Sequence, residues 1–152
     1  MTNDQVLAVA IRAAHRASSV ILDAARDLRR RPAHAKDHGD IAAEAETEAE
    51  NAIIATLRAA FPDQAIVGAE AGEIVSQIQA NTRANEKSYR WIIDPIDGTA
   101  NFVHGYPCYA VSIALTYAGE VTHAVVLDPV RDEIYTAIKG KGAQQNGTPI
   151  RT

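Results

Sequence analysis

One segment of this chain carries most of the information about its structure and chemistry: Trp91-Ile92-Ile93-Asp94-Pro95-Ile96-Asp97-Gly98-Thr99-Ala100-Asn101-Phe102. It begins with an aromatic and two β-branched residues, a composition typical of a buried strand. We expect this strand to end at Pro95, which has a carboxylate close by on either side. Gly98 and Thr99 then provide the flexible backbone and the hydroxyl that often open a helix or a tight turn.

The carboxylates of Asp94 and Asp97 are so close in sequence that they should repel each other unless a cation lies between them. Mg²⁺ prefers oxygen ligands of this kind, and it usually keeps several waters and also binds phosphate oxygens. If Gly98 and Thr99 open a helix, their amides would face an anion held by that ion. The pattern therefore indicates metal-assisted phosphate chemistry. An Asp-Pro turn followed by a helix cap would give the same residues a purely structural role.

The composition is that of a folded protein rather than a disordered one. Of the 152 residues, 47% are apolar and 22% are charged, which is enough to bury a core as one domain. The net charge of −4 gives no reason to expect nucleic-acid binding through bulk electrostatics. With Cys108 as its single cysteine, the chain has no internal disulfide and no cysteine-based zinc cluster. We expect a cytoplasmic protein with neither a signal peptide nor a membrane span.

The periodicity of the sequence predicts an α+β fold, with two long N-terminal helices packed on an antiparallel sheet. Residues 4–31 carry an apolar stripe at helical spacing that ends at Pro32, and residues 41–60 carry a second stripe, rich in alanine. From residue 109 onward, alternating apolar positions are separated by turn residues, which predicts an antiparallel meander. The strands expected outside the segment quoted above are 65–67, 109–117, 121–127, 133–138 and 143–145. We expect Cys108 to be a small packed residue.

The run from Asp94 to Phe102 closely resembles the signature of the inositol monophosphatases, which belong to the Mg²⁺-dependent, Li⁺-sensitive sugar phosphatases. Residues 104–113 and 135–147 are also similar to this family, especially to its bacterial extragenic-suppressor branch. The resemblance extends from about Val6 to Thr152. It implies the N-terminal half of the layered sugar-phosphatase fold.

The resemblance also implies roles for individual residues. Three of them would bind Mg²⁺: Asp94, Ile96 through its carbonyl, and Asp97. The amides of Gly98 and Thr99 would bind the substrate phosphate. Thr99 would also be catalytic, helping to position an attacking water, and Glu46 would orient it. Glu46 stands where the family has an aspartate, so its side chain is one methylene longer.

One position departs from the family pattern. Family members have a Glu-Glu pair directly after the strand at 65–67, and the first glutamate of the pair binds metal. Here the two positions hold Ala69 and Glu70. The loss of this carboxylate should weaken metal binding. Either Glu70 rotates in as a metal ligand or the site is impaired, and the sequence leaves both possibilities open.

Family members continue into a second α/β domain that carries a Trp-Asp motif, whereas the single tryptophan here is Trp91. We therefore expect residues 1–152 to be one metal-binding domain, with the C-terminal domain of the family absent. The resemblance implies a Mg²⁺-dependent phosphomonoesterase in which a metal-activated water attacks an inositol or sugar phosphate, and it implies a homodimer. The alternative is a non-catalytic interaction protein on the same fold, contacting RNA polymerase or another transcription or RNA-processing complex.

Overall fold

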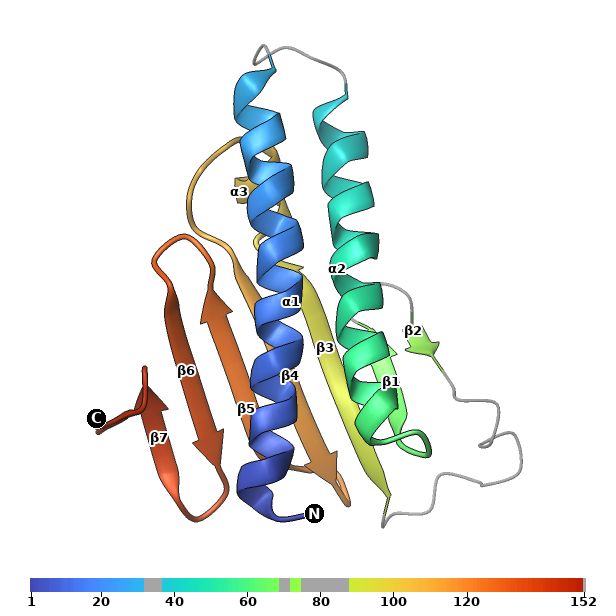
Figure 1. Cartoon of the computed structure of the whole chain (residues 1–152), viewed down its shortest axis with the longest axis vertical. Helices are drawn as coiled ribbons and strands as arrows, with labels where there is room; N and C mark the ends of the chain where they lie inside the picture. Colours follow the sequence, from blue (N-terminus) through green and yellow to red (C-terminus); the bar gives the residue numbers. More distant parts are fainter. Residues whose placement is uncertain (32–36, 69–71, 75–87, 152) are drawn as a thin grey trace.

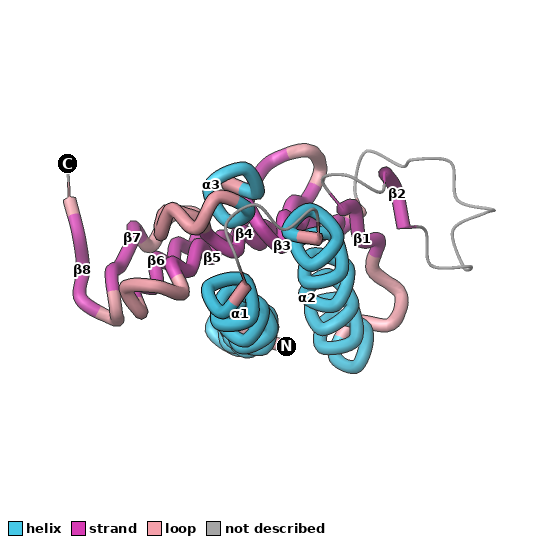
Figure 2. The backbone as a smooth tube through the Cα atoms, turned by 90° about the horizontal axis from the view of Figure 1, so that it is seen from above, coloured by secondary structure: helices cyan, strands magenta, loops and turns pink. Residues whose placement is uncertain are grey.

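A computed structural model describes residues 1–31, 37–68, 72–74 and 88–151 of the chain, and there two long helices cover one face of a sheet (Figures 1 and 2). The helices are α1 (Asn3–Arg30) and α2 (His38–Ala60), and a short helix α3 (Thr99–Val103) follows the third strand. Within these ranges the sheet has eight strands in the spatial order β2-β1-β3-β4-β5-β6-β7-β8. The strands are β1 (Ala65–Gly68), β2 (Gly72–Ile74), β3 (Tyr89–Asp97), β4 (Ala110–Tyr117), β5 (Glu120–Asp128), β6 (Glu133–Ile138), β7 (Gly142–Gln145) and β8 (Thr148–Ile150).

Helix α1 is amphipathic and has a well-defined start. The Gln5 backbone N–H donates to the Thr2 hydroxyl over 3.2 Å, and the Thr2 N–H donates to the Gln5 side chain over 2.8 Å, forming a capping box. Arg29 and Arg30 occupy the last turn, where positive charge complements the helix dipole. The apolar stripe packs against α2, β4 and β5, and its buried members are Val6, Val9, Ala10, Ala13, Ala14, Ala17, Ile21, Ala25 and Leu28.

The core fills the space between these two helices and the sheet. Trp91 is fully buried, its Nε1 donates to Oε1 of Gln64 over 2.7 Å, and its ring lies 5.5 Å from that of Phe61. Ile92, the next residue on β3, is 45% exposed, because successive strand residues point to opposite faces. On β5, Val126 is 38% exposed between the buried Val125 and Leu127. The face of the sheet away from α1 and α2 therefore carries exposed apolar side chains.

The predicted fold class is confirmed, since two long helices lie on a sheet in which β3 to β8 pair antiparallel in sequence order. Some details differ from the prediction. β1 pairs with β3 in parallel, α2 begins at His38 rather than Ile41, and Cys108 is exposed rather than packed. No helix in the described part of the chain combines the length and the apolar character that a membrane span requires.

The buried histidine of β5, His123, should make the stability of the fold depend on pH. The side chain is 5% exposed, its Nδ1 lies 3.0 Å from the Thr122 hydroxyl, and its Nε2 is buried without a hydrogen-bond partner among the described residues. Burial lowers the pKa of His123 below its ordinary value of 6.5, although the nearby Asn3 backbone acts in the opposite direction. When the pH falls below 6.5, His123 therefore gains a proton in the unfolded chain before it does so in the folded chain. The free energy of unfolding decreases as a result.

We expect the urea midpoint of unfolding to fall between pH 7.5 and pH 5.5, and to fall less in His123→Gln, which cannot gain that proton. His15→Gln is the matched control, because it makes the same chemical change at an exposed position on α1. An equal pH dependence in wild type and His123→Gln would contradict this assignment.

Candidate metal centre

The predicted end of the third strand at Pro95 is wrong, because β3 continues to Asp97. Asp94 pairs with Ser112 of β4 and Asp97 pairs with Ala110, so three steps along β3 match two steps along β4. The extra residue forms a β-bulge. A bulge can accommodate Pro95 inside a paired strand, because a proline has no N–H to donate to the ladder.

The bulge places both carboxylates on one face of the sheet. In a regular strand, residues three apart point to opposite faces, whereas residues two apart share a face. Ser112 and Ala110 are two apart on β4, flank the buried Val111, and point away from the helices. Their cross-strand partners Asp94 and Asp97 therefore lie on that same outer face. Asp94 is half-buried there and Asp97 is exposed.

The turn after Asp97 depends on Gly98. This residue is the N-cap of α3 and has φ of 95°, a left-handed conformation that favours glycine. A Cβ at this position would lie 2.9 Å from the backbone oxygen of Cys108, so the close approach of the two chain segments also requires glycine. The Thr99 hydroxyl donates to the Ile96 carbonyl over 2.9 Å and holds the turn closed. The backbone that follows the carboxylates is thus held by the neighbouring Cys108 segment and by the Thr99 hydrogen bond.

Helix α3 is anchored by two side chains, those of Asn101 and Phe102, for which the sequence alone indicated no individual role. Phe102 is buried and meets the ring of Tyr109 edge to face, with the ring centres 5.2 Å apart. The Asn101 side-chain amide donates to the Cys108 carbonyl over 2.8 Å. Asn101 therefore ties α3 to the backbone that also approaches Gly98. The position of Asn101 directly before the apolar Phe102 hinted at a structural role for this polar side chain. Its partner could not be predicted, because every residue has a backbone carbonyl.

The oxygen atoms near the bulge fit a hard divalent cation. Asp94 and Asp97 supply carboxylates on one face, and Mg²⁺ favours such ligands. The Ile96 carbonyl has two lone pairs, so it can accept the Thr99 hydrogen bond and still contact an ion. Among the described residues, no group of three or more His, Cys, Asp or Glu side chains is placed to hold a metal. We call these two carboxylates and one carbonyl the half-site, and its binding of a metal ion stays a prediction.

For two other residues predicted for the site, the predicted role stays untested. Glu70 lies outside the described residues, as does Ala69. Glu46 is half-buried on α2, the helix that packs against both β3 and α3. Because the Thr99 hydroxyl donates to the Ile96 carbonyl, the orientation of Thr99 by Glu46 stays a prediction.

The chain is similar in sequence to one family of known proteins along almost its whole length. A family model described as the inositol monophosphatase family matches residues 2–152. A curated protein called Nus factor SuhB, from Pseudomonas aeruginosa, is 44% identical over 96% of this chain and 52% of its own length. The protein of the same name from Escherichia coli is 36% identical over the same shares of the two chains. The chain thus spans about half the length of the curated relatives it matches.

Solved structures show the same fold. The extragenic suppressor protein suhB of Bartonella henselae matches with a TM-score of 0.81 at 31% identity, covering 97% of this chain and 54% of that one. An inositol monophosphatase from Anabaena matches with a TM-score of 0.78 at 31% identity, covering 99% of this chain and 51% of that one. Both structures contain about as many residues again as the part they share with this chain.

Proposed function

We propose, because the chain belongs to the inositol monophosphatase family, that it is the metal-binding half of a magnesium-dependent phosphomonoesterase. The bulge in β3 supports this proposal most strongly, because it brings Asp94 and Asp97 to one face beside the Ile96 carbonyl. These three groups would hold Mg²⁺, with Glu70 as a fourth ligand. When bound, the ion would polarise an inositol or sugar phosphate and lower the pKa of a nearby water.

The residues after the bulge would bind and orient the substrate. The amides of Gly98 and Thr99 lie at the start of α3, where backbone N–H groups are suited to phosphate oxygens. Oγ1 of Thr99 donates its proton to the Ile96 carbonyl, so its lone pairs remain available to accept a hydrogen bond from a water. Thr99 would thereby help to orient the attacking water, and Glu46 would assist from α2.

The outer face of the sheet, which lies away from α1 and α2, has features of a surface on which a second structural unit could pack. Ile92 and Val126 are exposed on the face that also carries Asp94 and Asp97, and relatives are about twice as long. We propose that a second α/β unit packs on this face and completes both the metal site and the substrate pocket. The direct test is a chimera of residues 1–152 with the part of Pseudomonas aeruginosa SuhB that follows its matched region. Release of phosphate from inositol 1-phosphate, dependent on Mg²⁺, is the expected result.

Restoring the missing family carboxylate should raise the activity of this chimera. In Ala69→Glu an additional carboxylate becomes available to the ion, and we expect roughly tenfold faster phosphate release at limiting Mg²⁺, the scale on which single groups around a metal alter affinity. Ala69→Gln is the control, because it adds a similar volume without charge. Equal rates for the two variants would show that position 69 contributes nothing to the metal site.

A second function is favoured by the names of the relatives, since the matched Pseudomonas aeruginosa and Escherichia coli proteins are both called Nus factors. Under this alternative, the chain is a non-catalytic protein that contacts RNA polymerase or another transcription complex, and the alanine at position 69 reflects relaxed demands on the metal site. A homodimer is expected under either function. A chimera that releases no phosphate even as Ala69→Glu, while the chain binds purified bacterial RNA polymerase, would favour the alternative.

A further inference from the structure

A cavity lies at the end of the molecule where α1 ends and α2 begins, away from the residues of the candidate metal centre. Its volume is about 590 Å³, within the range of small-molecule sites. None of Asp94, Asp97, Gly98 and Thr99 lines it. The described lining residues come from the last turns of α1, the first turn of α2, and the segment from α3 to β4: Ala25, Leu28, Arg29, Arg31, His38, Gly39, Phe102, Val103, His104, Gly105, Pro107 and Tyr109.

The polar lining of this cavity is basic. It contains two arginines, Arg29 and Arg31, and two histidines, His38 and His104, and no aspartate or glutamate is among the described lining residues. The whole chain has a net charge of −4, so the positive charge of the two arginines runs against the overall balance. The other lining residues include apolar ones, of which Val103 and Pro107 are more exposed than the buried Leu28, Phe102 and Tyr109. The cavity therefore combines a cationic rim with an apolar interior.

Two observations on α2 support an anionic occupant. Nε2 of His38 is buried and has no hydrogen-bond partner among the described residues, so an oxygen in the cavity would satisfy it. His38 and Gly39 open α2, and the side chain of its N-cap, Asp37, makes no capping hydrogen bond. The first backbone N–H groups of α2 therefore lack a side-chain cap, although Asp40 in its first turn complements the helix dipole.

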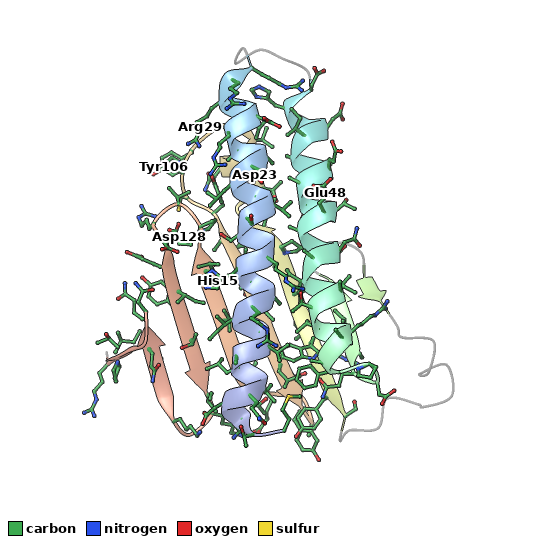
Figure 3. All side chains as sticks on the ribbon, in the orientation of Figure 1. His15, Asp23, Arg29, Glu48, Tyr106 and Asp128 are labelled. Atoms are coloured by element: carbon green, nitrogen blue, oxygen red, sulfur yellow. The ribbon has the colours of Figure 1, made fainter. Side chains whose placement is uncertain are left out.

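Arg29 is positioned to meet a negative group in the cavity. Figure 3 shows Arg29 and Tyr106 at the same end of the molecule, where the loop after α3 passes the end of α1. Burial raises the pKa of the Tyr109 hydroxyl, and the positive charge of Arg29 acts on it in the opposite direction. Arg29 is thus close enough to the cavity wall for its charge to reach Tyr109. Arg31 makes a long and exposed ion pair of 3.4 Å with Asp37, which a stronger anion could replace.

We propose that this cavity binds a small organic anion, in which one carboxylate, sulfonate or phosphate is attached to a flat apolar body. The anionic group would lie between Arg29, Arg31 and His38, and the apolar body would pack against Val103 and Pro107. This site does not depend on the proposed phosphatase activity, because it shares no lining residue with the metal centre.

The test is a fluorescence titration of the chain with 8-anilinonaphthalene-1-sulfonate and with its uncharged relative N-phenyl-1-naphthylamine. We expect the sulfonate to bind at one site and its affinity to fall roughly tenfold in Arg29→Gln and further in the double variant with Arg31→Gln, as charge-assisted contacts are removed. Arg29→Lys should keep most of the affinity. Binding of the uncharged probe should not change in any of these variants.

Two matched controls locate the site. Arg26→Gln removes an arginine from the same helix that does not line the cavity, and Ile92→Lys alters the exposed apolar face of the sheet. Neither variant should change sulfonate binding. An affinity that is equal in wild type and the Arg29 and Arg31 double variant, or that is lost in Ile92→Lys, would overturn the proposal. Since these arginines are exposed, loss of folding is not expected, and circular dichroism of each variant verifies it.

Discussion

Replacing Asp94 with asparagine should lower the rate of phosphate release by the chimeric enzyme by about 10²–10³-fold, because a bound ion supplies several kcal/mol of charge stabilisation in phosphate hydrolysis. Asp94 is the half-buried member of the carboxylate pair, and it pairs with Ser112 in the centre of the sheet. The asparagine keeps the shape of the side chain but removes the charge that attracts the ion. The measurement is phosphate release from inositol 1-phosphate at saturating Mg²⁺.

Asp63→Asn is the matched control for this prediction. Asp63 is exposed in the turn before β1, and because β1 runs parallel to β3 with Ala65 opposite Arg90, it lies at the far end of β3 from Asp97. The control makes the same chemical change, so its activity should equal that of the unmodified chimera. Full activity in Asp94→Asn would exclude this residue as a metal ligand.

The Gly98→Ala substitution should reduce the free energy of unfolding by about 2–3 kcal/mol, through backbone strain and a steric clash together. With φ of 95°, an alanine would be held in a conformation that L residues rarely adopt. Its Cβ would also lie 2.9 Å from the Cys108 carbonyl, a backbone atom that cannot move without disturbing the Asn101 hydrogen bond. Urea unfolding followed by circular dichroism measures the loss.

Gly105→Ala separates the two contributions. Gly105 also has a positive φ, of 71°, but a Cβ there would meet nothing within 4 Å. We expect a loss of only about 1 kcal/mol, from backbone strain alone. If Gly98→Ala and Gly105→Ala cost the same, the close approach of Cys108 to Gly98 does not constrain the turn.

The sequence was sufficient to predict the layers of this fold. The stripe on α1 repeats at helical spacing over 28 residues, and the meander alternates with a period of two. These periodicities result from burial of one face, so they are visible without coordinates.

The features that shape the site depend on contacts between distant segments. Pro95 indicated the end of a strand, yet pairing with β4 carries β3 through it by means of a bulge. The parallel pairing of β1 with β3 and the contact of Asn101 with Cys108 are also long-range. Local propensity describes the average behaviour of a residue and is overridden where tertiary pairing is strong. The motif showed that two carboxylates lie close together in sequence, but it did not show that the bulge would bring both to the same face of the sheet.

The central claim is that this chain by itself holds a cation half-site at the end of β3. Isothermal titration of Mg²⁺, and of Mn²⁺ as its surrogate, into the wild-type chain and into Asp94→Asn tests that claim most directly. We expect saturable binding to the wild type at millimolar concentrations and loss of that binding in Asp94→Asn. Absence of binding to both proteins, or equal binding to both, would contradict it.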